Sequence, residues 1–178
     1  DEKQIVKIKY NNNIYSFKVN LIGKIQIKNI VMAMLAAEKS NINFKKIVNV
    51  INKIKPVNGR LEKIGKLRNN AKVILDYAHT PDALKSCLQS LRDQFKNRKI
   101  SIVFGCGGER DKSKRPKMGK IANNYCNKIY LTDDNPRKEN PKKIRSEIKS
   151  KISKFKLNEI PSREKAIDKA ISELLSGE

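Results

Sequence analysis

The sequence predicts an α/β protein built around a mostly parallel β-sheet with helices on both faces. Three observations predict this class. From residue 58 onward, short apolar runs alternate with amphipathic helix-like stretches, polar loops follow the apolar runs, and the residues before 58 show a different pattern. Strands that alternate with helices are typical of parallel sheets, because each crossover helix covers a face of the sheet.

The first 57 residues predict a β-hairpin followed by two helices. Apolar and polar residues alternate on both sides of Asn11-Asn12-Asn13, which is typical of two strands joined by a tight turn. Apolar residues then recur at helical spacing until Pro56, which ends the second helix. The predicted elements are a hairpin over residues 4–21, a helix from Ile25 to Ala37 with Ile27, Ile30, Val31, Met34 and Leu35 on one stripe, and a helix from Phe44 to about Ile54. We place a domain boundary between residues 57 and 58.

Residues 58–178 repeat a unit of strand, polar loop and helix. Thr80 and Ser162 are placed to cap helices, and Pro81, Pro116 and Pro141 lie at or near helix starts. The predicted strands are Val73–Leu75, Ile100–Phe104, Ile129–Leu131 and a weaker one near Lys156–Ile160. In the last helix, the residues expected to face the core are Ala166, Ile167, Ala170, Ile171 and Leu174.

The chain has 178 residues and a formal net charge of +22 at pH 7. Clustered basic residues would indicate nucleic-acid binding, but the lysines are scattered along the whole chain. We therefore attribute them to a composition bias and expect no nucleic-acid partner. A non-catalytic basic α/β domain that binds nucleotides or nucleic acids stays open as an alternative function.

Apolar runs and cysteines give no sign of a membrane span or a metal site. No apolar run approaches the roughly 18 residues of a span, so we expect a cytoplasmic protein without a membrane partner. Cys87, Cys106 and Cys126 show no CxxC spacing, so neither a disulfide framework nor a zinc site is indicated. We interpret them as reduced thiols in or near the core.

Polar loops follow the predicted strands at Leu75, Phe104 and Leu131. Parallel sheets bind ligands at the carboxyl ends of their strands, so we expect these three loops to converge. The third loop contains Asp134-Asn135-Pro136-Arg137, in which the proline restricts the backbone and the arginine offers a planar fork of donors to a carboxylate or phosphate. We interpret this loop as a ligand-binding loop.

The other two loops have structural explanations as well as functional ones. His79, the only histidine, is either a packing residue or a functional one, and it stands three residues after Asp76. Gly105-Cys106-Gly107-Gly108 predicts either a phosphate cradle or a tight turn. The basic residues from Arg110 to Arg115 form either a solvated helix start or a contact to an anion at a helix N-terminus.

These loops resemble the motifs of a known family. Residues 76–84 (DYAHTPDAL), 103–116 (VFGCGGERDKSKRP) and 132–137 (TDDNPR) are similar, in order and spacing, to three motifs of the Mur ligase family. The resemblance covers essentially the whole chain. It implies that residues 1–57 are the C-terminal part of a central ATP-binding domain, and that residues 58–178 are a Rossmann-like C-terminal domain, truncated at its end, that binds an amino acid.

The Asp-Asn-Pro-Arg loop is similar to that of the family members that add diaminopimelate. The resemblance implies an ATP-dependent ligase that joins meso-2,6-diaminopimelate to UDP-N-acetylmuramoyl-L-alanyl-D-glutamate through an acyl phosphate in peptidoglycan precursor synthesis. ATP and Mg²⁺ are the implied cofactors, and the expected state is a monomer. A guanidinium suits the second carboxylate of diaminopimelate and repels the far ammonium of lysine. A lysine-adding Mur ligase is the alternative within the family.

The resemblance also implies roles for single residues. Those that match the diaminopimelate pocket are Arg110, Asp134, Asn135, Pro136 and Arg137, and those that match ATP contacts are Asn29, Arg60, Asp76 and His79. No catalytic residue and no metal ligand is assigned. Gln26 stands where the family often has Asn, and Glu109 where many members have Asp. The phosphate-holding Gly-Lys-Thr/Ser loop and the Gly-Lys-Gly-His-Glu segment expected after the last helix are absent, so we expect no ligase turnover by these residues alone.

Overall fold

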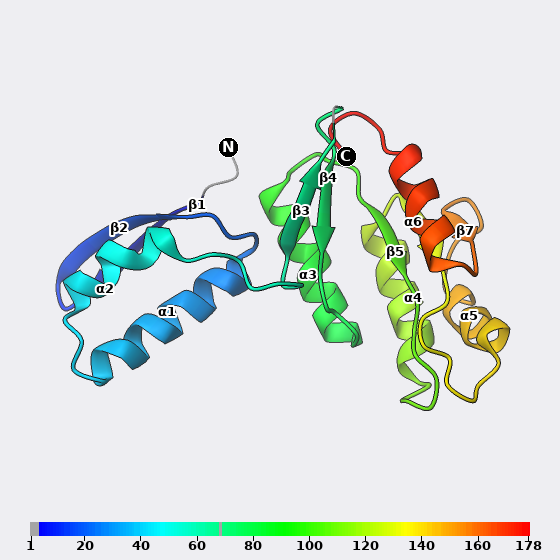
Figure 1. Cartoon of the computed structure of the whole chain (residues 1–178), viewed down its shortest axis with the longest axis horizontal. Coiled ribbons are helices and arrows are strands. Elements are labelled where there is room, and N and C mark those ends of the chain that lie inside the picture. Colours follow the sequence, from blue (N-terminus) through cyan, green and yellow to red (C-terminus); the bar gives the residue numbers. More distant parts are fainter. Residues whose placement is uncertain (1–3, 68) are drawn as a thin grey trace. The chain divides into compact units, whose positions relative to one another are not determined.

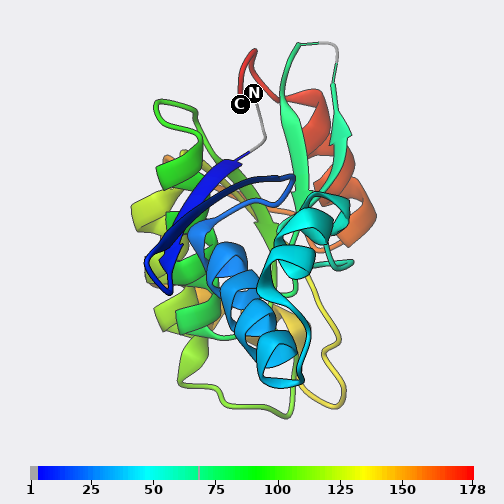
Figure 2. The same cartoon turned by 90° about the vertical axis from the view of Figure 1, so that its left-hand side faces the viewer.

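The computed structural model describes residues 4–67 and 69–178, and the chain divides into two compact units. The first unit comprises the residues up to Ile64 together with Ile74–Tyr77. The second comprises Gly65–Val73 and Ala78–Glu178. Figures 1 and 2 show both units, which are described separately below.

The first unit begins with the predicted hairpin. Strands β1 (Gln4–Tyr10) and β2 (Asn13–Val19) pair antiparallel, with Tyr10 opposite Asn13. The two turn residues, Asn11 and Asn12, have φ angles of 46° and 59°. Asparagine tolerates this left-handed conformation better than most residues, which explains why an asparagine-rich turn joins the strands.

Two helices cover the hairpin and form the core of this unit. They are α1 (Lys24–Lys39) and α2 (Phe44–Val50), and the 3₁₀ turn η1 (Ile51–Lys53) follows α2. The Asn43 side chain caps α2 by accepting hydrogen bonds from two backbone N–H groups of its first turn. The buried core residues are Phe17, Val19, Leu21, Ile30, Met34, Phe44, Ile47 and Ile51. Both predicted helices are confirmed, but Leu35, expected on the inward stripe of α1, is exposed.

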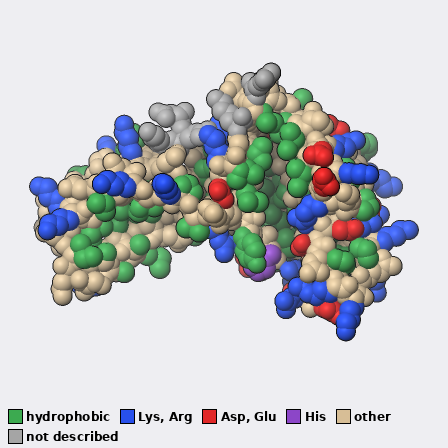
Figure 3. Space-filling model, viewed as in Figure 1, with side chains coloured by type: hydrophobic (Ala, Val, Ile, Leu, Met, Phe, Trp, Pro, Cys, Tyr) green, Lys and Arg blue, Asp and Glu red, His purple; other side chains and the backbone are tan. Residues whose placement is uncertain are grey.

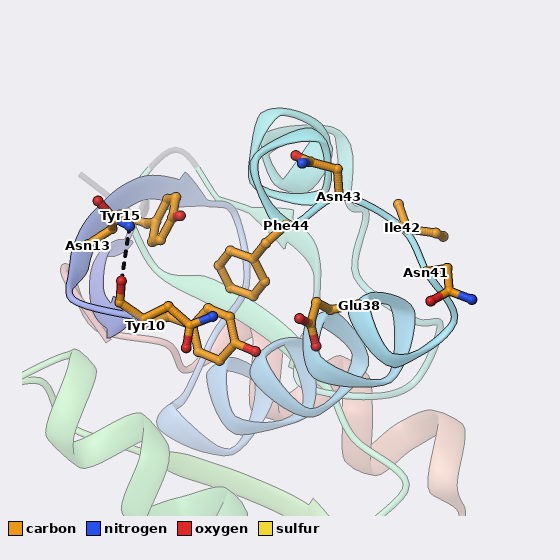
Figure 4. Close-up of a pocket in the computed structure, with 9 residues that line it drawn as sticks. Tyr10, Asn13, Tyr15, Glu38, Asn41, Ile42, Asn43 and Phe44 are labelled. Atoms are coloured by element: carbon orange, nitrogen blue, oxygen red, sulfur yellow. Dashed lines mark hydrogen bonds between the residues drawn. The ribbon is translucent and has the colours of Figure 1, made fainter.

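Aromatic rings pack between the end of the hairpin and the start of α2. The Tyr10 ring stacks on Phe44 with a centroid distance of 4.4 Å, and Tyr15 meets Phe44 edge-on at 5.0 Å. Figure 4 shows these rings lining a pocket with Glu38. Burial raises the pKa of the Tyr10 hydroxyl, and the neighbouring Glu38 carboxylate raises it further. Offset aromatic contacts of this kind stabilise a fold beyond their buried area.

A short two-stranded sheet corrects the sequence prediction. It pairs β3 (Glu62–Lys66) with β4 (Lys72–Leu75), and the division between the units passes through it. Strand β3 was not predicted, because its sequence has a single large apolar residue, Ile64. The predicted strand at Val73–Leu75 is confirmed, but it pairs with β3 and not with the parallel strands.

The second unit contains the predicted parallel sheet. Its strands are β5 (Ser101–Phe104), β6 (Lys128–Leu131) and β7 (Leu157–Glu159), all parallel, in the order β5-β6-β7. Its helices are α3 (Pro81–Gln94), α4 (Lys114–Tyr125), α5 (Pro141–Lys149) and α6 (Arg163–Ser172). This arrangement confirms the predicted α/β class.

The central strand β6 is buried on both faces. Ile129 and Leu131 point to a core shared with α3, α4 and α5, whereas Tyr130 points to Ala166 and Ala170 of α6. Successive side chains of a strand point to opposite faces, so helices must lie on both sides of the sheet. Figure 1 shows α6 in front of the sheet and α4 behind it.

Two details of the helices bear on the predictions. Thr80 and Ser162 accept hydrogen bonds from backbone N–H groups of α3 and α6, which confirms both predicted caps. Ile167 and Ile171, which were expected to face the core, are 41% and 37% exposed. Ala166 and Ala170 are the α6 residues that are buried against Tyr130 of the sheet.

The cysteines match their interpretation as core or near-core thiols. All three are thiols and not disulfides; Cys106 and Cys126 are buried, and Cys87 is half-buried. Burial raises the pKa of Cys106 to about 11 and that of Cys126 to about 12. Among the described residues, no helix is long and apolar enough to cross a bilayer.

Candidate functional site

Two of the three predicted ligand loops lie side by side in the second unit. They are the loop from β5 to α4, residues 105–113, and the loop from β6 to α5, residues 132–140. The backbone N–H of Gly108 donates to the carbonyl of Asn135 at 2.8 Å, and that of Thr132 donates to the carbonyl of Phe104 at 3.0 Å. The predicted convergence is therefore observed for these two loops.

Glycines in the first loop allow the second loop to approach closely. A Cβ atom on Gly105 would lie 2.2 Å from the carbonyl oxygen of Thr132, and one on Gly108 would lie 1.9 Å from that of Pro136. Neither glycine has a left-handed φ angle. The second loop fills the space that a side chain at either glycine would need, so these glycines let the two loops pack closely.

Arg137 is held in a defined direction by contacts to both loops. Its backbone has a φ of 50°, and its N–H donates to the Asn135 side-chain oxygen at 3.2 Å, across Pro136. Its guanidinium Nη1 donates to the Gly108 carbonyl at 2.7 Å. The side chain is otherwise exposed, so the other N–H groups of the fork can meet an anion.

Charged residues of both signs lie in or next to the two loops that hold Arg137. Arg110 is exposed, and among the described residues its side chain forms no hydrogen bond or ion pair. Asp134 is half exposed and lies 3.6 Å from the Nη2 atom of Arg163, the first residue of α6. Arg163 also donates to the Asp133 carbonyl at 3.1 Å. Arg163 lies outside every sequence motif and was not predicted.

Arg115 lies beneath the loops, and both of its predicted roles are wrong. Its side chain is fully buried, and it donates to both oxygens of Glu139, at 2.9 and 3.0 Å, and to Glu147 at 2.8 Å. Glu139 also accepts from the backbone N–H of Glu109 at 2.5 Å. These contacts lower the pKa of Glu139 to about 2, chiefly through Arg115. A cation in the first turn of a helix is unfavourable because of the helix dipole. The position of Arg115 in the first turn of α4 was therefore a sign in the sequence that it has acidic partners.

A second buried arginine fixes the start of the β6–α5 loop. Arg145 of α5 pairs with Asp133 and also with Glu159 at 2.9 Å. The Thr132 hydroxyl, which is buried, donates to the Pro161 carbonyl at 2.9 Å. Thr132 and Asp133 are therefore structural residues, and the part of the loop that is open to a ligand begins at Asp134.

The residues matched to ATP contacts are divided between the units. In the first unit, the Arg60 guanidinium lies 5.0 Å from the centroid of the Tyr77 ring, and Asp76 accepts from the backbone N–H of Leu61 at 2.8 Å. The Arg60 carbonyl accepts from the side chain of Gln26 at 3.2 Å. The structure thus places the segment with Arg60 beside the segment with Asp76 in the first unit.

Asn29 and His79 are the other two residues matched to ATP contacts. Asn29 is exposed on α1, one turn after Gln26, and therefore lies on the same helix face. His79 belongs to the second unit, where it is exposed and its carbonyl accepts from the Lys114 side chain at 2.9 Å. This contact joins the loop after β4 to the start of α4.

The chain fits only part of an ATP site. Arg60 and Tyr77 offer a cation and an exposed ring to a nucleotide. The sequence has no Gly-Lys-Ser/Thr loop for the phosphates. Among the described residues, no group of three or more His, Cys, Asp or Glu side chains could hold a metal ion. We therefore derive no phosphoryl-transfer step from these residues.

Comparison with known proteins decides the family. Residues 59–178 match the family described as "Mur ligase, glutamate ligase domain". This chain belongs to the Mur ligase family. The family predicted from the three sequence motifs is therefore confirmed. The β5–β7 sheet and the two loops at its carboxyl end lie within the matched residues.

Several Mur ligases named for diaminopimelate addition are similar over nearly the whole chain. The UDP-N-acetylmuramoyl-L-alanyl-D-glutamate–2,6-diaminopimelate ligase of Rickettsia felis is 42% identical over 96% of the chain and 32% of its own length. The ligase of the same name from Rhizobium meliloti is 39% identical over 99% of the chain and 36% of its own length. The chain thus spans about a third of the length of these relatives.

Solved structures agree with the fold. A structure of a UDP-N-acetylmuramoyl-L-alanyl-D-glutamate–2,6-diaminopimelate ligase is 32% identical, with a TM-score of 0.66, over 97% of this chain and 35% of that one. A Mycobacterium tuberculosis folylpolyglutamate synthase complexed with ADP and AMPPCP has a TM-score of 0.78 at 20% identity over 97% of this chain and 38% of that one. The second likeness concerns the fold alone.

Proposed function

We propose that this chain is the diaminopimelate-binding part of an ATP-dependent Mur ligase. The ligase joins meso-2,6-diaminopimelate to UDP-N-acetylmuramoyl-L-alanyl-D-glutamate in cytoplasmic peptidoglycan precursor synthesis. Residues 58–178 bind the amino acid, and residues 1–57 belong to the central ATP-binding domain. The names of relatives that are 39% and 42% identical support this substrate. The prediction that the protein is a monomer stays a prediction.

The pair of loops around Arg137 is the observation that carries the proposal. Diaminopimelate has an ammonium and a carboxylate at each end, so its far end needs both a cationic and an anionic partner. Arg137 and Arg110 offer the cations, and Asp134 offers the carboxylate. Asn135 and Pro136 shape the loop. The Asn135 side-chain oxygen accepts from the backbone N–H of Arg137, and the Pro136 carbonyl accepts from the backbone N–H of Glu139.

The same charges disfavour lysine as the substrate. Lysine carries an ammonium but no carboxylate at its far end, so its binding would leave Arg137 without an anion and bring two cations together. By gripping the far end of diaminopimelate, the loops would orient the near amine for attack on an activated carboxylate. When bound, ATP would supply the phosphoryl group for that activation, and Mg²⁺ would neutralise its charge. In this proposal the residues that contact the nucleotide are Asn29, Arg60, Asp76 and His79.

The test is a chimera in which this chain replaces the matching third of the Rickettsia felis ligase. We expect phosphate release that depends on ATP, the nucleotide-linked dipeptide and meso-diaminopimelate. Arg137→Ala should lower kcat/KM for diaminopimelate about 10- to 100-fold, since one charge-assisted contact is lost, and should leave the KM for ATP within about twofold. Lys138→Ala, at the exposed neighbouring position, is the matched control. A chimera that prefers L-lysine would contradict the proposal.

A further inference from the structure

The amino ends of the three parallel strands carry a basic surface that the proposed function does not use. Because β5, β6 and β7 are parallel, the segments that precede them lie at one edge of the sheet. Asn127 N–H donates to the Ile100 carbonyl at 2.7 Å, and Ile129 N–H donates to the Lys156 carbonyl at 2.8 Å, so these segments touch. We define the amino-end surface as Lys96, Arg98, Lys99, Lys128, Lys151, Lys154, Phe155 and Lys156.

Half of these residues are lysines without a counter-ion. The side chains of Lys96, Lys99, Lys151 and Lys154 are exposed, and none of them makes a hydrogen bond or ion pair within the described ranges 4–67 and 69–178. Neighbouring strands are about 5 Å apart, so the segments before β5 and β7 lie within roughly one Debye length of each other. Their positive potentials therefore add.

The contacts of the nearby carboxylates lie with other groups. Glu173 pairs with Lys128 at 3.3 Å and also accepts from Tyr130. Asp93 accepts from the Gln89 side chain at 2.8 Å. Glu178 is buried and accepts from the Ser101 hydroxyl. Within the described residues, none of these three carboxylates forms an ion pair with the four exposed lysines.

Phe155 projects from the segment that precedes β7. It is 101% exposed, although the nearby Ile152 and Leu157 pack on the core and anchor the loop on both sides. Lys156, the next residue, is fixed by hydrogen bonds to the carbonyls of Asn123 and Cys126 at 2.8 and 3.0 Å. A held loop with a protruding apolar ring at its tip is a candidate contact surface.

Helix dipoles explain only part of this surface. Lys96 and Lys151 follow the C-terminal ends of α3 and α5, where cations are favourable. The dipoles give no reason for a fully exposed phenylalanine, which would gain about 2 kcal/mol or more on burial. A partner that buries the ring and also carries negative charge accounts for both features.

We propose that the amino-end surface docks this protein on an anionic lipid bilayer, with Phe155 inserted at the interface and the free lysines on lipid phosphates. A bilayer interface can take up a whole protruding ring between basic contacts. Single-stranded nucleic acid would instead need several exposed rings for successive bases, and the surface has only one. This docking is peripheral, and it departs from the expectation that the protein has no membrane partner. It leaves the carboxyl-end loops, at the opposite ends of the same strands, open to solutes.

The test is flotation of the chain with vesicles of phosphatidylcholine alone and with 30% phosphatidylglycerol (roughly the anionic fraction at which polybasic contacts act), at physiological salt. We expect binding to the anionic vesicles only. Phe155→Ala should weaken the partition coefficient about tenfold, and Lys151→Gln/Lys154→Gln about 30-fold. The matched control is Lys142→Gln/Lys143→Gln, which removes the same charge from exposed positions at the start of α5 and should change binding less than about threefold.

A fluorescence measurement follows insertion of the ring directly. The chain has no tryptophan, so Phe155→Trp adds a single indole. Its emission should shift to the blue with anionic vesicles and stay unchanged with phosphatidylcholine. Equal losses for the two lysine pairs would show that binding follows net charge alone and would overturn the proposal. Tighter, Phe155-dependent binding to a single-stranded oligonucleotide would also overturn it, in favour of nucleic acid.

Discussion

The loops at the carboxyl ends of β5 and β6 and the segments at the amino ends of β5 and β7 are both rich in basic residues, yet they differ in how those residues are paired. At the carboxyl ends, Arg115 and Arg145 are buried and paired with glutamate or aspartate. At the amino ends, Lys96 and Lys154 are exposed without a counter-ion in the described structure. A formal charge of +22 therefore combines two kinds of basic residue.

This difference teaches how to interpret a basic composition. The paired arginines have a structural task, which is to hold the two loops through their ion pairs. Four exposed lysines at the amino ends, Lys96, Lys99, Lys151 and Lys154, make no such contact within the described residues, so either composition bias or an external partner explains them. Figure 3 shows that Lys and Arg side chains are scattered over the visible face of both units, as the sequence indicated. The amino-end surface stands out only because parallel pairing gathers segments that are distant in the sequence.

The largest effect is expected for Arg115. Arg115→Ala should lower the free energy of unfolding by about 3–5 kcal/mol, because two carboxylates beside a packed loop lose their buried partner. Lys154→Ala, at the amino ends, should change it by less than about 0.5 kcal/mol. Urea unfolding of both variants measures these changes in the free energy of unfolding. Equal stabilities would break the distinction between paired and unpaired cations.

The next effect concerns the contact between the two loops. Gly108→Ala should destabilise the chain by about 1–3 kcal/mol, since the new Cβ would overlap the Pro136 carbonyl and push the loops apart. Gly65→Ala is the control, because its Cβ would meet only the Val73 side chain at 3.9 Å. Thermal unfolding should separate the two variants. A Gly108→Ala protein as stable as wild type would mean that the loops do not need close packing.

A pH effect is expected at the carboxyl ends of the strands. The pKa of Glu139 is lowered from 4.5 to about 2 in the folded chain, chiefly by Arg115. A carboxyl with a depressed pKa stabilises the fold above its ordinary value and loses this contribution as the pH falls from about 4.5 towards 2. Unfolding measured across this window should therefore show a steeper loss for wild type than for Glu139→Gln. Parallel curves would show that Glu139 does not contribute.

The smallest expected effect is on the labelling rates of the cysteines, which compare burial at the two ends of the parallel strands. Cys106 follows β5 and Cys126 precedes β6, and burial raises the pKa of both thiols. At pH 8 a thiol reagent should therefore label the half-buried Cys87 first and leave the other two thiols protected until the chain unfolds. Fast labelling of Cys126 alone would show that the amino end is open.

The sequence predicted the regular elements well, because local patterns determine them. Asn11-Asn12 between alternating runs, Thr80 before Pro81, and the apolar run of β6 each carry a local signal. Strand β3 was missed because edge pairing can form a strand without an apolar pattern. Ile167 and Ile171 were misplaced because periodicity does not show how closely a helix approaches its sheet.

The sequence showed which loops carry the candidate ligand-binding residues, but not which residues hold those loops in place. Arg110 and Arg137 stand in motifs, and polar residues at strand ends predict a ligand. The burial of Arg115 depends on Glu139 and Glu147, which come from other elements, so no local pattern could reveal it. The roles of Gly105 and Gly108 likewise depend on a neighbouring loop. These contacts form because the parallel pairing of β5 and β6 brings the two loops together, which the spacing of residues in the sequence does not show.

The most direct test of the account is NMR titration of the ¹⁵N-labelled chain with meso-diaminopimelate and, separately, with L-lysine. We predict that diaminopimelate shifts the amide signals of Gly107, Gly108, Arg110 and Arg137 and the side-chain signal of Arg137, and that lysine at equal concentration shifts them much less. Arg137→Ala should remove the preference, whereas Lys138→Ala should keep it. Equal shifts with both amino acids, or shifts confined to the first unit, would contradict the claim that these two loops bind the far carboxylate of diaminopimelate.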